Sequence, residues 1–140
     1  MAVRLGSLLT PPGIVLIEGP LGIGKTALVQ ALLRRAGVGG PVKSPTFDLV
    51  HPHQGPRGRY LHVDLYRLEA PPPPEELDVD ADEALVLVEW GGPWAPYFPD
   101  HVAACIAKTD RGRRLTLQGV GTWAARVRAW ADGSRGGSST

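Results

Sequence analysis

One run of eight residues carries the clearest chemical signal in the sequence. It is Gly19-Pro20-Leu21-Gly22-Ile23-Gly24-Lys25-Thr26, a complete match to the phosphate-loop pattern Gly-x4-Gly-Lys-[Ser/Thr]. Glycines let successive backbone N–H groups point inward around a phosphate, and a helix that begins at Lys25 adds the positive end of its dipole. Lys25 would then reach the β- and γ-phosphates, and the Thr26 hydroxyl would be a ligand of Mg²⁺. The run predicts a binding site for a nucleoside triphosphate and its divalent cation.

Two acidic residues are candidates for the metal side of this chemistry. Mg²⁺ held by one hydroxyl and by phosphate oxygens usually needs a carboxylate at the end of a core strand, as a ligand or through water. Asp64 ends the segment Tyr60–Val63, and Glu89 ends the segment Leu85–Val88. Either acid alone is also explained as an ordinary surface residue at a strand end. Beside a complete phosphate loop the two together favour a metal and water site, and the residues alone leave open which acid places the water.

The phosphate loop needs a buried strand before it and a helix after it. Gly13–Gly19 is a short, continuous block rich in β-branched residues, which predicts a central strand. From Lys25 onward apolar residues recur at helical spacing, and Arg34 and Arg35 lie where the helix dipole favours cations. Gly37 can cap this helix. The loop is therefore expected between a core strand and a helix.

Further strands and turns follow along the chain. Apolar runs, turn residues and a helical spacing near the end define them. They are a hairpin of strands 46–51 and 60–66, an extended proline spacer 71–74, a second core strand 84–90, a hairpin of strands 102–107 and 114–118, and a helix 122–130. Strands interleaved with helices predict an α/β fold of the P-loop NTPase class, with a mostly parallel central sheet, antiparallel edge strands and flanking helices.

Length and composition indicate one domain. The chain has 140 residues, 43% of them hydrophobic, which suits one buried core and excludes a second independent domain. We expect a single domain over residues 1–133 and a small polar tail without structure over 134–140. The formal net charge of +1 excludes a strong overall field for attracting nucleic acid or an anionic membrane.

The sequence also predicts a cytoplasmic location without membrane contact. No apolar run approaches the roughly 18 residues needed to cross a bilayer, and the first residues lack the pattern of a secretory signal. The single cysteine, Cys105, cannot form an internal disulfide, and we expect it in the core of an apolar strand.

Three weaker patterns have ordinary explanations. Ala107-Lys108-Thr109-Asp110 partly matches the segment with which GTPases read guanine, but an alanine replaces a polar side chain and a hairpin turn follows, so ATP is favoured over GTP. His51 and His53 share one face of a strand and are expected to be solvated. Arginines after residue 110 make the C-terminal region locally basic, which fits a solvated face, a phosphate contact or an RNA footprint.

The order of these motifs resembles that of the TsaE family, the small P-loop ATPases of bacterial tRNA threonylcarbamoyladenosine synthesis. The stretches that carry the resemblance are Gly19–Thr26, Val42–Phe47, His62–Leu68 and Leu87–Trp90. The phosphate loop alone fits very many proteins. Three further motifs together are specific to the family: Lys-Ser-Pro-Thr, Asp-Leu-Tyr-Arg-Leu and Val-Glu-Trp.

The resemblance implies a role for each matching residue. The residues implied to bind nucleotide are Leu21, Gly22, Ile23, Gly24, Lys25 and Thr26. Thr26 and Glu89 are implied to hold Mg²⁺, and Trp90 to pack beside the site. Residues 43–46 are implied to form a switch-like loop facing the γ-phosphate, which makes Thr46 a catalytic candidate together with Lys25 and Glu89. Asp64 is implied as a second essential acid, for the switch or the attacking water.

The amino end is short for the family. Either the assigned start lies too far downstream, or nucleotide affinity depends on the phosphates and on loop residues near Gly112 and Arg113. We therefore include Gly112 and Arg113 among the candidate nucleotide-binding residues.

The resemblance also implies partners. TsaE-family ATPases work with TsaD and TsaB, which transfer threonylcarbamoyl onto the adenosine 3′ of the anticodon, so tRNA is reached through the complex. Turnover by the isolated chain should be slow. Two alternatives remain open: a small-molecule kinase, although its only candidate lid, residues 71–83, has no arginine, and a non-hydrolysing nucleotide-binding module.

Overall fold

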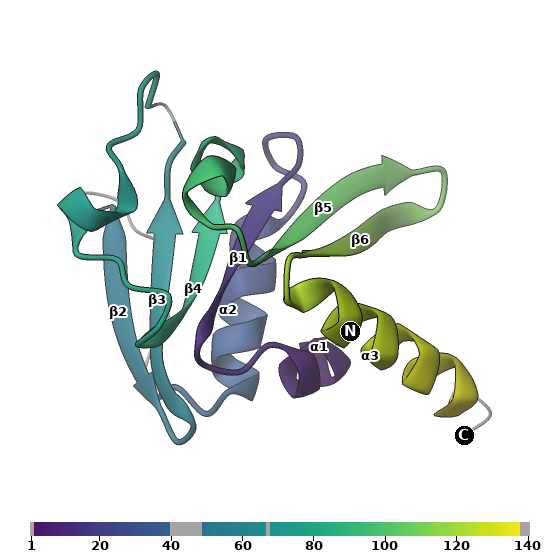
Figure 1. The fold of residues 1–140 in the computed structure, drawn as a ribbon. Helices are drawn as coiled ribbons and strands as arrows, with labels where there is room; N and C mark the ends of the chain where they lie inside the picture. The colour runs from purple at the N-terminus through teal and green to yellow at the C-terminus, as the bar shows by residue number, and fades with distance from the viewer. Residues whose placement is uncertain (1, 40–48, 67, 138–140) are drawn as a thin grey trace.

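The computed structural model describes residues 2–39, 49–66 and 68–137 of the chain (Figure 1). In chain order the elements are α1 (Ala2–Leu8), β1 (Gly13–Glu18), α2 (Lys25–Arg35), β2 (Val50–Gly55), β3 (Gly58–Asp64), the 3₁₀ helix η1 (Pro74–Leu77), β4 (Ala84–Glu89), the 3₁₀ helix η2 (Gly92–Tyr97), β5 (His101–Thr109), β6 (Gly112–Val120) and α3 (Trp123–Gly137). The switch-like loop expected at residues 43–46, with Thr46, lies outside the described residues.

The strands form one six-stranded sheet in the order β2-β3-β4-β1-β5-β6. The inner strands β3, β4, β1 and β5 run parallel, whereas β2 and β6 pair antiparallel with β3 and β5 at the two edges. Strands β1 and β4 lie in the middle and are covered on both faces, which explains their continuous apolar sequences. The predicted α/β fold, with a mostly parallel sheet and antiparallel edges, is confirmed.

The two faces of the sheet are covered differently. One face packs against the α-helices through an apolar cluster that includes Leu5 of α1, Leu33 of α2 and Trp123 of α3; α2 lies behind the sheet in Figure 1. The opposite face packs against the segment that contains η1 and η2, through a cluster with Val79 and Trp94. Trp94 is fully buried, and its Nε1–H donates to the carbonyl of Pro72 at 2.9 Å. The proline-rich segment is thereby fixed to the sheet on the side away from α2.

Two predicted boundaries on the edge of the fold are wrong in detail. Strand β2 runs through Pro52 to Gly55, beyond the predicted end at residue 51, so the hairpin turn is confined to residues 56 and 57. The predicted start at residue 46 lies outside the described residues. An edge strand tolerates a proline because it needs hydrogen bonds on one side only. Pro74, expected in an extended spacer, begins η1, because the fixed φ of proline also suits the first turn of a helix.

The last helix is longer than the predicted range 122–130. It runs to Gly137 and so includes the first residues of the segment 134–140 that was expected to lack structure. Trp123 and Val127 of this helix are buried, and Trp130 donates from Nε1 to the carbonyl of Arg4 at 3.1 Å. Within the described ranges, no helix combines the length and apolar character needed to span a bilayer.

Cys105 is exposed, so its expected place in the core is wrong. Ala104 and Ile106 of β5 face the helices and are buried, and the alternation of side chains along a strand sends Cys105 to the opposite side. Among the described residues, no residue of β5 or β6 belongs to the cluster under η1 and η2. On the face that carries Cys105, the strand is covered at His101, which is buried, and is open at Cys105.

Candidate functional site

The loop between β1 and α2 has a backbone that requires glycine. Gly22 and Gly24 have φ of 81° and 113°, in the left-handed region that side chains disfavour. A Cβ added at Gly24 would lie 2.4 Å from Nη1 of Arg113, and one added at Gly19 would lie 2.7 Å from the carbonyl oxygen of Ile106. The glycines of the motif therefore permit both the fold of the loop and its close approach to β5 and β6.

Lys25 begins α2 and points back into the loop. The side chain is buried, and its Nζ donates to the carbonyls of Gly19 at 2.6 Å and Pro20 at 2.9 Å. The same nitrogen lies 3.9 Å from the ring centroid of Trp90, within the range of a cation–π contact. Burial lowers the pKa of Lys25, and the nearby carboxylates, Glu89 first, oppose that shift. The loop thus holds a desolvated ammonium group, which an anion such as a phosphate would stabilise.

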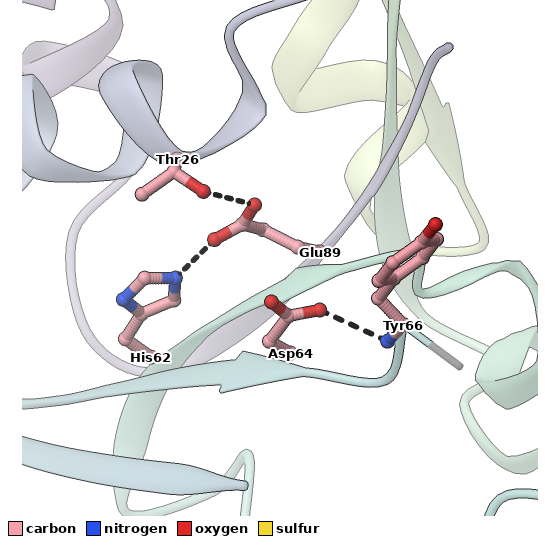
Figure 2. Close-up of polar contacts among 5 residues, drawn as sticks. All are labelled: Thr26, His62, Asp64, Tyr66 and Glu89. Carbon is pink, nitrogen blue, oxygen red and sulfur yellow. Dashed lines mark hydrogen bonds and ion pairs between the residues drawn. The ribbon is translucent and has the colours of Figure 1, made fainter. Parts of the chain in front are cut away.

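Glu89 links α2 to the sheet. Its Oε1 accepts a hydrogen bond from Thr26 Oγ1 at 2.6 Å, and its Oε2 lies 2.5 Å from Nε2 of His62, as Figure 2 shows. Glu89 is 3% exposed, so its negative charge has little contact with water. A hydroxyl beside a carboxylate is the oxygen donor set with which proteins bind Mg²⁺ together with substrate phosphates. Thr26 and Glu89 fit such a cation.

Asp64 lies next to Glu89 because β3 and β4 pair in parallel with these two residues in register. Its Oδ1 accepts the backbone N–H of Tyr66 at 2.9 Å (Figure 2). Burial raises the pKa of Asp64 and the charge of Glu89 adds to the rise, while the hydrogen bond from Tyr66 opposes it. A carboxylate with a raised pKa accepts a proton more readily, as a general base must.

Two aromatic rings border the site. Trp90 follows β4 with φ of 59°, which is uncommon for a residue with a bulky side chain. Its ring lies 4.9 Å from that of Tyr66, centroid to centroid, with an angle of 31° between the planes. A cavity of about 230 Å³ between loop and rings is lined by Leu21, Gly22, Gly24, Lys25, Thr26, Ala27, Asp64, Tyr66, Glu89 and Trp90. Leu21 is 70% exposed at the tip of the loop.

Arg113 reaches the phosphate loop from the hairpin of β5 and β6. Arg113 donates from Nη1 to the carbonyl of Ile23 at 2.9 Å. A second cavity, of about 450 Å³, is lined by Ile23, Gly24, Ala27, Leu28, Ala31, Ile106, Gly112, Arg113 and Leu115. The turn between Thr109 and Gly112 is the predicted hairpin turn. This mostly apolar cavity beside the loop has the character of a pocket for a planar base.

The structure brings together most of the residues singled out from the sequence. Lys25, Thr26, Asp64 and Glu89 line one cavity, and Gly112 and Arg113 line the next. Thr46 lies outside the described residues. His51 and His53 belong to no possible metal group within the described part of the chain, and His53, expected to be solvated, has a buried Nε2 and a pKa lowered by burial.

Sequence reasoning gave no role to the contact between His62 and Glu89. The available signal was the spacing of His62 and Asp64, because residues two apart in a strand share one face.

The sequence of this chain is similar to those of known proteins. The protein-family model described as "Threonylcarbamoyl adenosine biosynthesis protein TsaE" matches residues 1–115. The chain belongs to the TsaE family. The TsaE protein of Streptomyces coelicolor is 37% identical over 133 residues, covering 86% of this chain and 90% of its own length. The TsaE protein of Nostoc sp. is 34% identical over 124 residues, covering 81% of this chain and 74% of its own length.

A solved structure supports the fold of this TsaE-family chain. The crystal structure of Bacillus subtilis YdiB has a TM-score of 0.72 with it, covering 95% of this chain and 86% of YdiB. Sequence identity between the two is 20%, so the likeness concerns the arrangement of the elements.

Proposed function

We propose that the protein is a Mg²⁺-dependent ATPase that supports threonylcarbamoyl modification of the tRNA adenosine next to the anticodon (t6A), acting with TsaD and TsaB in the cytoplasm. The observation that carries the ATPase is the 2.6 Å contact between Thr26 Oγ1 and Glu89 Oε1 beside a complete phosphate loop. The relatives from Streptomyces coelicolor and Nostoc sp. are described as tRNA threonylcarbamoyladenosine biosynthesis proteins, which supports the modification pathway.

The phosphate loop would bind the β- and γ-phosphates of ATP. Backbone amides of residues 21–26 would donate to the phosphates, and Lys25 would exchange the carbonyls of Gly19 and Pro20 for phosphate oxygens. Lys25 then stabilises the negative charge that develops during hydrolysis. Thr26 and Glu89 would hold Mg²⁺, which when bound neutralises charge on the β- and γ-phosphates.

Asp64 is our candidate for orienting the attacking water. It lies beside Glu89 at the carboxyl end of the sheet, and its raised pKa suits a group that accepts a proton. Thr46 is a second candidate for placing water, on the strength of the family resemblance. The adenine base would enter the cavity of about 450 Å³ beside Arg113, whose apolar lining suits a planar base.

Hydrolysis by the isolated chain should be slow. Among the described residues that line the cavity of about 230 Å³, Lys25 is the only one with a cationic side chain. A missing arginine-type contact is worth about 10³ or more in rate. TsaD and TsaB would supply what the open site lacks.

The test is phosphate release by the purified chain, with and without TsaD, TsaB and tRNA. We expect slow release alone, faster release with the partners, and none above background for Lys25→Ala. If Lys25→Ala released phosphate as fast as the wild type, the reaction would not take place at this loop.

The same measurement separates the two rival functions. A small-molecule kinase would consume ATP in response to a metabolite and not to TsaD and TsaB; its candidate lid packs on the sheet face away from α2, through Leu77 and Val79. A non-hydrolysing module would bind ATP or ADP and release no phosphate even with all partners present.

A further inference from the structure

His62 is a fully buried polar residue that the proposed reaction does not use. It lies on β3, two residues before Asp64, and its relative exposure is 0%. Its Nε2 is 2.5 Å from Oε2 of Glu89 on the neighbouring strand β4. Because a carboxylate only accepts hydrogen bonds, Nε2 must carry the proton and donate it.

The hydrogen bonds of Glu89 fix the orientation of its carboxylate. Thr26 donates to Oε1 and His62 donates to Oε2, so each oxygen has its own donor, as Figure 2 shows. Glutamate has three rotatable side-chain bonds, and without the second donor the carboxylate can turn about the last of them. Donation to Oε2 therefore keeps Oε1 turned toward Thr26.

A purely structural role explains His62 poorly. Its other ring nitrogen, Nδ1, is buried and has no hydrogen-bond partner among the residues that the structure describes. A buried nitrogen without a partner costs free energy. The residue in register on β4 is Leu87, which is fully buried in the apolar cluster next to α2. An apolar residue would fill this position without that cost, so the useful part of the imidazole is its Nε2–H.

We propose that His62 is a positioning residue, which holds the carboxylate of Glu89 so that Oε1 and the hydroxyl of Thr26 face one metal ion. The inference rests on the proposed function, since it concerns the Mg²⁺ that would accompany ATP. Hydrogen-bonding partners of metal ligands typically contribute about 10–100-fold to metal affinity. His62 should therefore affect binding of Mg²⁺–ATP and leave metal-free ATP unaffected.

The test compares three variants of the full-length chain by calorimetry. His62→Leu removes the donor and keeps an apolar side chain of moderate size, whereas His62→Gln retains an N–H at a similar distance from the backbone. His51→Leu is the matched control, because His51 pairs with His62 across β2 and β3. Each protein is titrated with ATP in excess Mg²⁺ and again in EDTA.

We expect His62→Leu to lose at least about 10-fold in affinity for Mg²⁺–ATP, with less than about a twofold change for ATP in EDTA. His62→Gln should recover most of the loss, and His51→Leu should match the wild type. The proposal would be overturned if folded His62→Leu had the same ratio of ATP affinities in Mg²⁺ and in EDTA as the wild type. An equal loss in His62→Gln or in His51→Leu would also overturn it.

A second readout needs no nucleotide. Nitrogen-15 NMR of the imidazole should find the proton of His62 on Nε2, with a shift that changes in Glu89→Gln. A proton on Nδ1 alone would overturn the proposal, even if His62→Leu fails to fold. A wild-type chain that binds ATP equally in Mg²⁺ and in EDTA would instead refute the metal site of the proposed function, and the role of His62 with it.

Discussion

At the scale of single residues, the site gathers charges that the folded chain would otherwise keep apart. Glu89 is buried, and Asp64 lies beside it in register on the neighbouring strand. Burial and the charge of Glu89 raise the pKa of Asp64. Buried charges placed close together often reduce the free energy of unfolding. Substituting each of the two acids allows this loss of stability to be measured separately from its proposed role in binding metal or water.

Asp64→Asn should stabilise the metal-free protein and, in a separate assay with Mg²⁺ and ATP, slow phosphate release. A carboxyl whose pKa is raised by folding costs nothing below its unfolded pKa, about 3.9, and becomes destabilising as the pH rises through the raised value. Asparagine keeps an oxygen for the Tyr66 N–H and carries no charge. In EDTA, the melting temperature of the variant should therefore exceed that of the wild type at pH 7.5 and match it near pH 3.5.

Phosphate release by Asp64→Asn should fall by about 10² or more if Asp64 places the water. A melting temperature difference that grows toward acid pH would contradict the assigned direction of the pKa shift.

Glu89→Gln should weaken binding of Mg²⁺–ATP much more than binding of ATP in EDTA. The amide keeps the shape of the side chain but has lost the charge that a divalent cation requires. We expect a loss of at least about 10-fold in the first affinity and less than about twofold in the second, by calorimetry. Glu18→Gln is the control: Glu18 also ends a core strand, but its carboxylate accepts the N–H of Gly92. Equal effects of Glu89→Gln on both affinities would remove Glu89 from the metal.

At the scale of elements, local patterns predicted what local geometry determines. Residue spacing within a short segment is enough to predict each of several features: the phosphate loop, the two core strands and the two acids at strand ends. The spacing of His62 and Asp64 places both on one face of β3. The contact between His62 and Glu89 joins residues 27 positions apart and also depends on the register of β3 against β4, which no local pattern reveals. The exposure of Cys105 likewise depends on which face of β5 the rest of the chain covers.

Gly119→Ala should separate α3 from the sheet. A Cβ at this position in β6 would lie 2.2 Å from the carbonyl oxygen of Trp123, at the first residue of α3, and backbone cannot give way as a side chain can. We expect a loss of about 1–3 kcal/mol, or roughly 3–9 °C in melting temperature.

Gly133→Ala is the matched control for that substitution. An added Cβ there meets no described atom within 4 Å, and alanine favours a helix over glycine by about 1 kcal/mol, so this variant should melt at or above the wild type. Equal melting temperatures for Gly119→Ala and the wild type would mean that α3 packs farther from β6 than described.

At the scale of the whole molecule, the site joins the helical layer to the sheet. Lys25 and Thr26 belong to α2. Asp64 is the last residue of β3 and Glu89 the last residue of β4, on the sheet face against which α2 packs. A ligand held by both layers can bind only when they are docked together. Nucleotide binding should therefore stabilise the folded chain as a unit, by mass action.

Mg²⁺–ATP should accordingly raise the melting temperature of the isolated chain, measured without TsaD and TsaB. At a ligand concentration of 100 times Kd the stabilisation is about 2.7 kcal/mol, or roughly 8 °C for a domain of this length. Lys25→Ala should show almost none of this rise, because it lacks the charge that we propose binds the phosphates, and Gly133→Ala should show all of it. The same rise in Lys25→Ala would mean that the nucleotide stabilises the fold from another surface, since nothing else in the loop replaces a buried ammonium group.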